Sequence, residues 1–482
     1  MNFSGLLFLI FAHFFAGKGI LRLFKIELPV FQQICLSFMI GVPVISFAPC
    51  FVQLMGLPIV MNTMVASTII TTLICSLPLV FPFRKPRMMV FAMPKIYEVP
   101  FLVIIVCLLI ISAWRAWYFP PTARDVLSGP ELLAEYAVKE KNMINSVFTI
   151  DLRTTNNYFK SPYLTCLQIL YKILVCPFGQ LWLTVLSTSF VCWLYVVIRE
   201  KCHPLLSAFI VFFFLITPDV YSYSFIILYD YSNMVFFFCG FYFLSGFLTS
   251  GKLNELLFAS FLFGLATYIR TETLILVMFI IPLLLFYFYK RKASWLDIGK
   301  YSIILVSFSA ILYFVCIDVF VKKFVIIPLD IKSQVNPNLF DLSVLVQRFL
   351  DMNFALIFSA SGLGTFAYFI YFFFILFFVD LIFFRKRYNH EARIALYGVT
   401  VIYFGVPFLG YLLPLFDLGN TTKRALFKAI PLMVWYISNG GLFSFLSEKI
   451  NNFELGISKP ISAVTAPKVA VKVQVTPRSK RK

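Results

Sequence analysis

A short polar stretch in the first third of the chain carries the first residue that is suited to catalysis. Residues 118–142, YFPPTARDVLSGPELLAEYAVKEKN, follow a long apolar region and contain Asp125 next to Arg124. A carboxylate in this position can act as a general base on a hydroxyl that arrives from the aqueous side. Alternatively, Asp125 is a solvated loop residue that pairs with Arg124, and the sequence leaves both interpretations open.

An arginine later in the chain is suited to binding an anion. In LATYIRTETLILV, Arg270 and Glu272 separate two short apolar segments. Residues two apart do not share a helix face, so we expect a break in the helix there. A guanidinium at such a break presents a planar fork to phosphate. Equally, Arg270 can pair with Glu272 or Asp230.

A third stretch, FDLGNTTKRALFKAIPLMVWYI, places Lys423, Arg424 and Lys428 at the start of an apolar segment. Either an anionic phosphate or snorkelling to the membrane interface accounts for these cations. Asp230, in the stretch LYDYSNMVFFF, leads straight into another apolar run. An ionisable group at membrane depth costs free energy and is a functional candidate by default.

The elements that position these residues are predicted to be membrane-spanning helices. Of the 482 residues, 61% are hydrophobic and 13% are charged, whereas soluble domains carry about 25% charged residues. The net charge of +19 is explained by basic cytoplasmic loops and anionic lipids, and we expect no nucleic-acid partner. No P-loop, Rossmann fingerprint or HExxH motif is present, which counts against a nucleotide-driven transporter or a metalloprotease.

We predict an all-α polytopic membrane protein with about thirteen transmembrane helices. Short basic loops such as FRKPRMM, YKRKASW and FRKRYNHEAR are assigned to the cytoplasm by the positive-inside rule, which places the N-terminus outside and the C-terminus inside. The predicted spans are 2–17, 28–49, 58–82, 100–119, 177–198, 205–228, 232–250, 256–269, 273–289, 301–321, 354–384, 394–416 and 425–446.

Asp125 then belongs to a large exterior loop, residues 120–176, that carries short interfacial helices. Ser128 or Gly129 can cap a helix that begins at Pro130. Leu132, Leu133, Tyr136 and Ala137 fall on one face of this helix, which we expect to lie on the outer membrane surface.

Together these stretches resemble the GT-C superfamily of integral-membrane glycosyltransferases, in its branch of protein O-mannosyltransferases and the lipid A aminoarabinose transferase. The likeness rests on PPTARDVLSGPE, on NNYFKSPYLTCLQILYKILVCPFGQLWL (156–183), and on LYDYSNMVFFFCGFYFL, LATYIRTETLILV and TKRALFKAIPLMVW. It covers roughly residues 100–440. The chain departs from the family in having three spans before the acidic loop, Arg124-Asp125 in place of an Asp-Glu pair, and no large C-terminal soluble domain.

The resemblance implies an inverting transfer of a sugar from a polyprenyl-phosphate carrier to a glycan, lipid or protein hydroxyl. Asp125 would be the catalytic base, and Arg270 with Lys423 or Arg424 would bind the donor phosphate. Some members of the family use a divalent metal, which Asp230 could serve, but the sequence indicates no metal or other cofactor. Six residues are assigned to substrate binding or to supporting the site: Arg124, Glu131, Lys160, Tyr163, Asp230 and Glu272.

The chain is thus divided into N-terminal membrane helices (1–99), a GT-C-like catalytic module (100–446) and a basic, disordered cytoplasmic tail (447–482). A bacterial plasma membrane is the expected location. The alternative function is a transporter or flippase of lipid-linked saccharides, which also needs many spans and buried ionisable groups.

Overall fold

The computed structural model describes residues 2–81, 93–149, 160–292, 294–321, 336, 341–358, 366–413 and 422–458. Within these ranges every regular element is a helix, which confirms the predicted all-α class. The elements are α1 (Phe3–Leu23), α2 (Val30–Ile45), α3 (Phe47–Leu54), α4 (Met61–Ser76), η1 (Leu77–Leu79), α5 (Val99–Tyr118), α6 (Arg124–Leu127), α7 (Pro130–Glu140), α8 (Ser146–Thr149), α9 (Tyr163–Leu174), α10 (Leu181–Arg199), α11 (Pro204–Ile216), α12 (Pro218–Tyr223), α13 (Tyr229–Ser250), α14 (Leu253–Ile269), α15 (Thr273–Met278), α16 (Ile281–Lys290), α17 (Trp295–Phe314), η3 (Val315–Val321), α19 (Leu342–Phe358), α20 (Phe366–Phe383), η5 (Arg385–Arg387), α21 (His390–Leu412), α22 (Lys423–Leu426), η7 (Phe427–Ala429), α23 (Ile430–Asn439) and α24 (Gly441–Ser458).

The part of the chain that the structure describes contains nine helical segments long and apolar enough to cross a bilayer, so the protein is a multi-pass membrane protein. A tenth span results if α22–α23 and α24 are counted as one, although they are bent by 48°. The nine segments are Phe3–Leu23, Val30–Leu54, Met61–Leu79, Val99–Tyr118, Leu181–Arg199, Tyr229–Ser250, Thr273–Lys290, Trp295–Phe314 and His390–Leu412.

The four remaining predicted spans, 205–228, 256–269, 354–384 and 425–446, do not each correspond to one of these nine segments. Pro218 follows α11 and begins α12, which divides the predicted span 205–228. The predicted span 256–269 corresponds to α14, an apolar helix of 17 residues, which is at the lower end of the length that crosses the hydrocarbon core. The predicted span 354–384 overlaps α19 and α20, with residues 359–365 outside the described ranges. The total of thirteen therefore stays a prediction.

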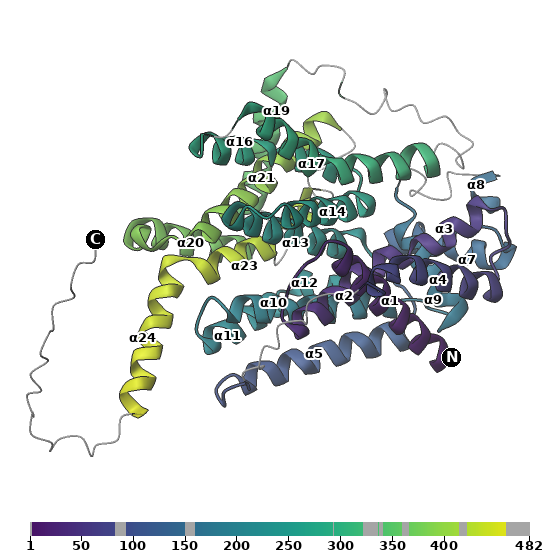
Figure 1. Cartoon of the computed structure of the whole chain (residues 1–482), viewed down its shortest axis with the longest axis horizontal. Helices are drawn as coiled ribbons and strands as arrows, with labels where there is room; N and C mark the ends of the chain where they lie inside the picture. Colours follow the sequence, from purple (N-terminus) through teal and green to yellow (C-terminus); the bar gives the residue numbers. More distant parts are fainter. Residues whose placement is uncertain are drawn as a thin grey trace, which may run out of the picture.

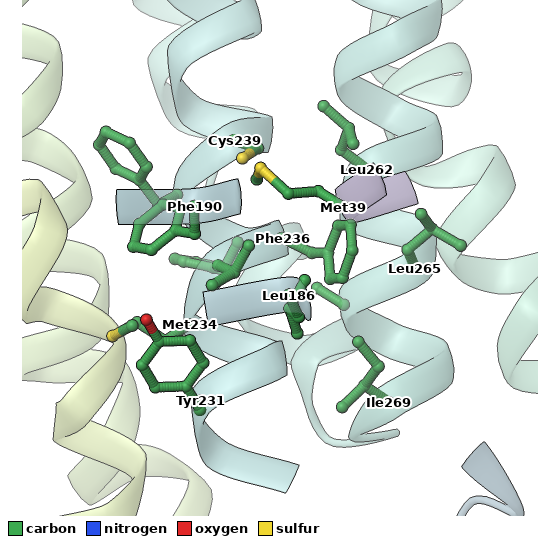
Figure 2. Packing of buried hydrophobic residues seen from close by; sticks show 14 of the residues in the cluster. Met39, Leu186, Phe190, Tyr231, Met234, Phe236, Cys239, Leu262, Leu265 and Ile269 are labelled. Carbon is green, nitrogen blue, oxygen red and sulfur yellow. The ribbon is translucent and has the colours of Figure 1, made fainter. Parts of the chain in front are cut away.

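Helix α13 lies at the centre of the hydrophobic core. Nearly every one of its side chains is buried, as expected for a helix that is apolar on all sides. It packs against α14, and also contacts α10 and α23. Figure 2 shows Tyr231, Met234, Phe236 and Cys239 of α13 among Leu186 and Phe190 of α10, Leu262, Leu265 and Ile269 of α14, and Met39 of α2.

The first two helices pack closely because glycines line their contact. A Cβ atom added at Gly17 would lie 1.8 Å from the carbonyl oxygen of Ser37, and one at Gly41 would lie 1.9 Å from that of His13. Small residues of this kind let the backbones of neighbouring membrane helices approach one another. This contact fixes α2, and with it α3, against the rest of the bundle.

The helices of the loop predicted to be exterior gather at one end of the bundle, near α3 and α4 (Figure 1). Helix α7 begins at Pro130 with Gly129 at its N-cap, as predicted. On its predicted apolar face Leu133 and Ala137 are buried, whereas Tyr136 is exposed. Helix α7 packs on α9, most of whose side chains are buried. Because α9 supplies this inner layer, α7 is the outer helix of the pair.

The C-terminal helix α24 projects from the opposite end of the molecule (Figure 1). It continues to Ser458, beyond the predicted end of the last span at residue 446. The rest of the predicted basic tail, residues 459–482, lies outside the described ranges.

Candidate functional site

Asp230 is the buried centre of the candidate site. It lies in the first turn of α13, where the positive end of the helix favours a carboxylate. Its side chain is completely shielded from solvent. One carboxylate oxygen accepts a hydrogen bond from Nη1 of Arg270, and the other accepts one from Nε of Arg424 at 3.0 Å. Two arginines therefore neutralise one buried acid, and a divalent metal at Asp230 would have to displace one of them.

Arg270 occupies the helix break that the sequence predicted. Helix α14 ends at Ile269, and Arg270 has extended backbone angles, with φ −137° and ψ 110°. Helix α15 begins three residues later, with Glu272 at its N-cap. Nε of Arg270 lies 2.6 Å from Oε1 of Glu272, as an ion pair in addition to the hydrogen bond to Asp230. Both acids named as alternative partners of Arg270 thus contact it, and its role in phosphate binding stays a prediction.

Asp125 joins this group of charges from the loop predicted to be exterior. It lies in α6, and its Oδ2 accepts a hydrogen bond of 2.6 Å from Nη1 of Arg424. Arg124, the alternative partner considered from sequence, has an exposed side chain. Because 36% of the Asp125 side chain is exposed, against 0% for Asp230, Asp125 is the acid that an incoming substrate can reach.

Arg424 therefore connects two acids that are far apart in sequence. Arg424 lies in α22 and contacts both Asp125 and Asp230. Asp230 in turn contacts Arg270, so the four side chains form a continuous chain of ion pairs. We call Asp125, Asp230, Arg270, Glu272 and Arg424 the ion-pair cluster. Its members come from α6, α13, the break between α14 and α15, and α22. The cluster therefore lies where α6, part of the loop predicted to be exterior, contacts α22 through the pair of Asp125 and Arg424.

Two lysines add positive charge beside the ion-pair cluster. Lys428, in η7, is completely buried, and its Nζ has no hydrogen-bond partner within the described part of the chain. It lies within electrostatic range of Arg270, Glu272, Asp230 and Arg424. An unpaired buried ammonium is costly, so Lys428 is the residue in this region most in need of an anionic ligand. The sequence interpretation grouped it with Lys423 and Arg424 but did not select it.

Lys160, which the sequence assigned a supporting role, also faces this region. Its pKa is lowered from 10.5 to about 8 by burial, and further by the charges of Arg270 and Arg424. The next residue, Ser161, accepts a hydrogen bond of 2.9 Å at its carbonyl from the hydroxyl of Tyr229, which precedes Asp230 in α13. Lys160 is thereby held near the start of α13.

Four lysines and arginines and three acids meet at this site. Lys160, Arg270, Arg424 and Lys428 give a formal charge of +4, and Asp125, Asp230 and Glu272 give −3, so the group has a formal charge of +1 with all members ionised. A buried site with excess positive charge is suited to an anion, since desolvation strengthens the attraction.

The remaining predicted residues lie around this centre. Glu131 pairs with Lys172 at 2.5 Å and accepts a hydrogen bond of 2.7 Å from Gln168, so its carboxylate joins α7 to α9. The Tyr163 hydroxyl donates to Ser232 at 3.1 Å, two residues beyond Asp230. Lys423 begins α22, but its side chain lies outside the described atoms.

The lowered pKa of Lys160 gives a testable pH dependence. The ammonium is charged below its pKa of about 8 and becomes neutral as the pH rises through that value. We therefore expect the affinity for an anion to fall as the pH rises through about 8, and Lys160→Gln to reduce this fall. Binding of a short prenyl phosphodiester, whose charge is constant over this range, measures the effect. Lys252→Gln, at an exposed lysine, is the control, and an unchanged slope in Lys160→Gln would contradict the prediction.

Comparison with known proteins identifies no relative. No family model matches the sequence, and no curated protein and no solved structure shows significant similarity to it.

Proposed function

We propose that the protein is a membrane glycosyltransferase that moves a sugar from a polyprenyl-phosphate donor to an acceptor hydroxyl on the non-cytoplasmic side. The observation that carries the proposal is the bridging position of Arg424. One guanidinium joins a partly exposed carboxylate, Asp125, to a buried and positively charged site. Such an arrangement brings a base for the acceptor next to cations for the donor phosphate.

In the proposed reaction Asp125 takes the proton of the acceptor hydroxyl. The acceptor oxygen attacks the anomeric carbon through an oxocarbenium-like state. The bond from this carbon to the phosphate oxygen breaks, and its electron pair stays on the phosphate. Arg270 and Arg424 stabilise the charge that grows there. A donor phosphate would compete with Asp125 for Arg424, and its binding would release the carboxylate to act as a base.

A lipid-linked donor also needs an apolar groove, and one begins near the ion-pair cluster. A cavity of about 440 Å³ lies between α16, α19 and α21, and is lined by apolar side chains such as Phe279, Phe349 and Phe404. Glu272 lies at the N-cap of α15, and Phe279 follows its last residue. Along a helix this separation is about 10 Å. A prenyl chain in the groove would thus have its phosphate close to Arg270.

The orientation and location belong to the same proposal. The N-terminus is placed outside and the C-terminus in the cytoplasm, in a bacterial plasma membrane, and the full set of predicted spans is retained. The support is the charge pattern of the loops. In this orientation α6, α7 and α9 are exterior, where an acceptor reaches Asp125.

The direct test is a transfer assay with purified protein in lipid, using a polyprenyl-phosphate sugar and a mixture of envelope glycan, lipid and peptide acceptors. We expect labelled sugar to become attached to an acceptor hydroxyl with inverted anomeric configuration, and free polyprenyl phosphate to be released. Movement of intact donor between the leaflets without release of polyprenyl phosphate would instead favour a flippase.

The groove gives a second arm of the same assay. Thr400 lines the groove and is exposed, so Thr400→Trp should fill it without disturbing the core. We expect this variant to lose at least about tenfold in kcat/KM for a long-chain donor and much less for a short-chain donor, because each buried CH₂ contributes about 0.8 kcal/mol. Ile303→Trp, at an exposed position of α17, is the matched control. Equal losses with both donors would remove the groove from the proposal.

A further inference from the structure

Two cysteines from distant parts of the chain meet at the exterior end of the bundle. Cys50 lies in α3 and Cys166 lies in α9, and their Sγ atoms are 3.3 Å apart. Both side chains are buried, with exposures of 1% and 0%. All ten cysteines of the chain lie within the described residues, and these two are the pair whose sulfur atoms contact each other.

The surroundings hold the two thiols in place. Helices α3 and α9 pack directly against each other. The thiol of Cys50 also points toward the carbonyl of Ser46, one turn earlier in the chain. A disulfide requires an S–S distance of about 2.05 Å, so the sulfur atoms need to approach by a little more than about 1 Å. Small rotations of the two side chains supply a movement of this size.

We propose that Cys50 and Cys166 form a disulfide that links the outer end of the second span to the exterior loop. The proposed topology places both residues on the non-cytoplasmic side, where disulfides form and persist. The proposal does not depend on the transferase activity, because it rests on the contact between the sulfur atoms and on the orientation of the chain.

The oxidant is a protein or small molecule that carries an exchangeable disulfide. A thiolate of one cysteine attacks this disulfide and forms a mixed disulfide, which releases one thiolate of the oxidant. The thiolate of the other cysteine then attacks the mixed disulfide and releases the second thiolate. The two cysteine thiols lose two electrons and two protons, and the oxidant takes up both as a dithiol.

The bond would restrain the part of the exterior loop that reaches the candidate site. Lys160 and Ser161 precede α9 by only a few residues, and α7 packs on α9. Cross-linking α9 to α3 therefore limits the movement of the segment that holds Lys160 near Asp230. Reduction would loosen this attachment without removing any residue of the ion-pair cluster.

Peptide mass spectrometry tests the proposal. Membranes are quenched with acid, denatured, alkylated with iodoacetamide, reduced, and alkylated again with N-ethylmaleimide. We expect Cys50 and Cys166 to carry the second label, and the unreduced sample to contain a peptide pair joined through them. Exposing the membranes to diamide, a small thiol oxidant that crosses membranes, should complete any partial oxidation.

Single variants separate this bond from other pairings. Cys50→Ser and Cys166→Ser should each abolish the linked peptide, whereas Cys176→Ser, at a buried cysteine that follows α9, should leave it unchanged. The linked wild-type protein should also unfold at a higher temperature before reduction than after it. Complete first labelling of both cysteines, with and without diamide, would overturn the proposal. A linked peptide that persists in Cys50→Ser would overturn it as well.

Discussion

Asp125→Asn is expected to lower kcat for sugar transfer by about 10²- to 10⁴-fold, the usual contribution of a positioned general base. The amide cannot take the acceptor proton, but it keeps an oxygen that can accept the hydrogen bond from Nη1 of Arg424. Because the Asp125 side chain is 36% exposed, the substitution should change the stability of the protein little. The reduction should therefore lie in kcat and not in the amount of folded protein.

Separate measurement of donor binding distinguishes a base from a binding residue. We expect the dissociation constant of the donor to stay within a few-fold of wild type in Asp125→Asn, while single-turnover transfer becomes slow. Asp297→Asn, at an exposed acid in the first turn of α17, serves as the control and should transfer at the wild-type rate. Asp125→Asn with a wild-type rate would remove Asp125 from the role of base. A large loss of donor affinity with unchanged kcat would make it a binding residue.

The helical class and the break at Arg270 were predictable because each depends on short-range pattern. The apolar content predicts membrane helices, and Arg270 and Glu272, which are two residues apart and do not share a helix face, predict an interruption between Ile269 and Thr273. The start of α7 was predictable for a similar reason, since proline favours the first helical turn. Each of these features depends on neighbouring residues alone.

The bridging role of Arg424 was not predictable in this way. Asp125 and Arg424 are separated by 299 positions, and nothing local in either stretch names the other as its partner. The sequence indicated only that each charge was costly at its position. Lys428 was considered but not selected for a related reason, because interfacial snorkelling and burial give the same pattern of a lysine before an apolar run. Its burial follows from the packing of η7 against α13.

Two of the predicted spans differ from single helices where a helix is interrupted without losing its apolar composition. The predicted spans 205–228 and 425–446 are continuous in hydropathy, but the first is divided at Pro218 and the second bends after Asn439. Proline cannot continue the hydrogen-bond ladder of a helix that it follows. Gly440, with ψ of 161°, leaves the helical conformation between α23 and α24. Hydropathy over a window of residues does not register either event.

Asp230→Asn should have the largest effect on stability, about 3–5 kcal/mol, which is the typical cost of breaking a buried ion pair. Its carboxylate is completely buried and accepts hydrogen bonds from both Arg270 and Arg424. An amide in its place removes the buried charge that the two guanidinium groups share, and leaves Arg270 with Glu272 alone and Arg424 with Asp125 alone. Unfolding of the purified protein in detergent, followed as a function of temperature or denaturant, measures the loss.

A double-mutant cycle tells whether the charge pairing itself is responsible. Arg424→Gln removes one of the two cations that lose Asp230 as a partner, so the double variant should be more stable than the sum of the single effects by about 0.5–3 kcal/mol. Glu448→Gln provides the comparison, because its ion pair with Arg387, at 2.7 Å, has side chains that are 43% and 58% exposed. An exposed pair contributes less than about 1 kcal/mol. If Asp230→Asn destabilised the protein no more than Glu448→Gln, the buried cluster could not be what holds α13, the α14–α15 break and α22 together. Asp125 would then not be held beside the arginines that are proposed to bind the phosphate.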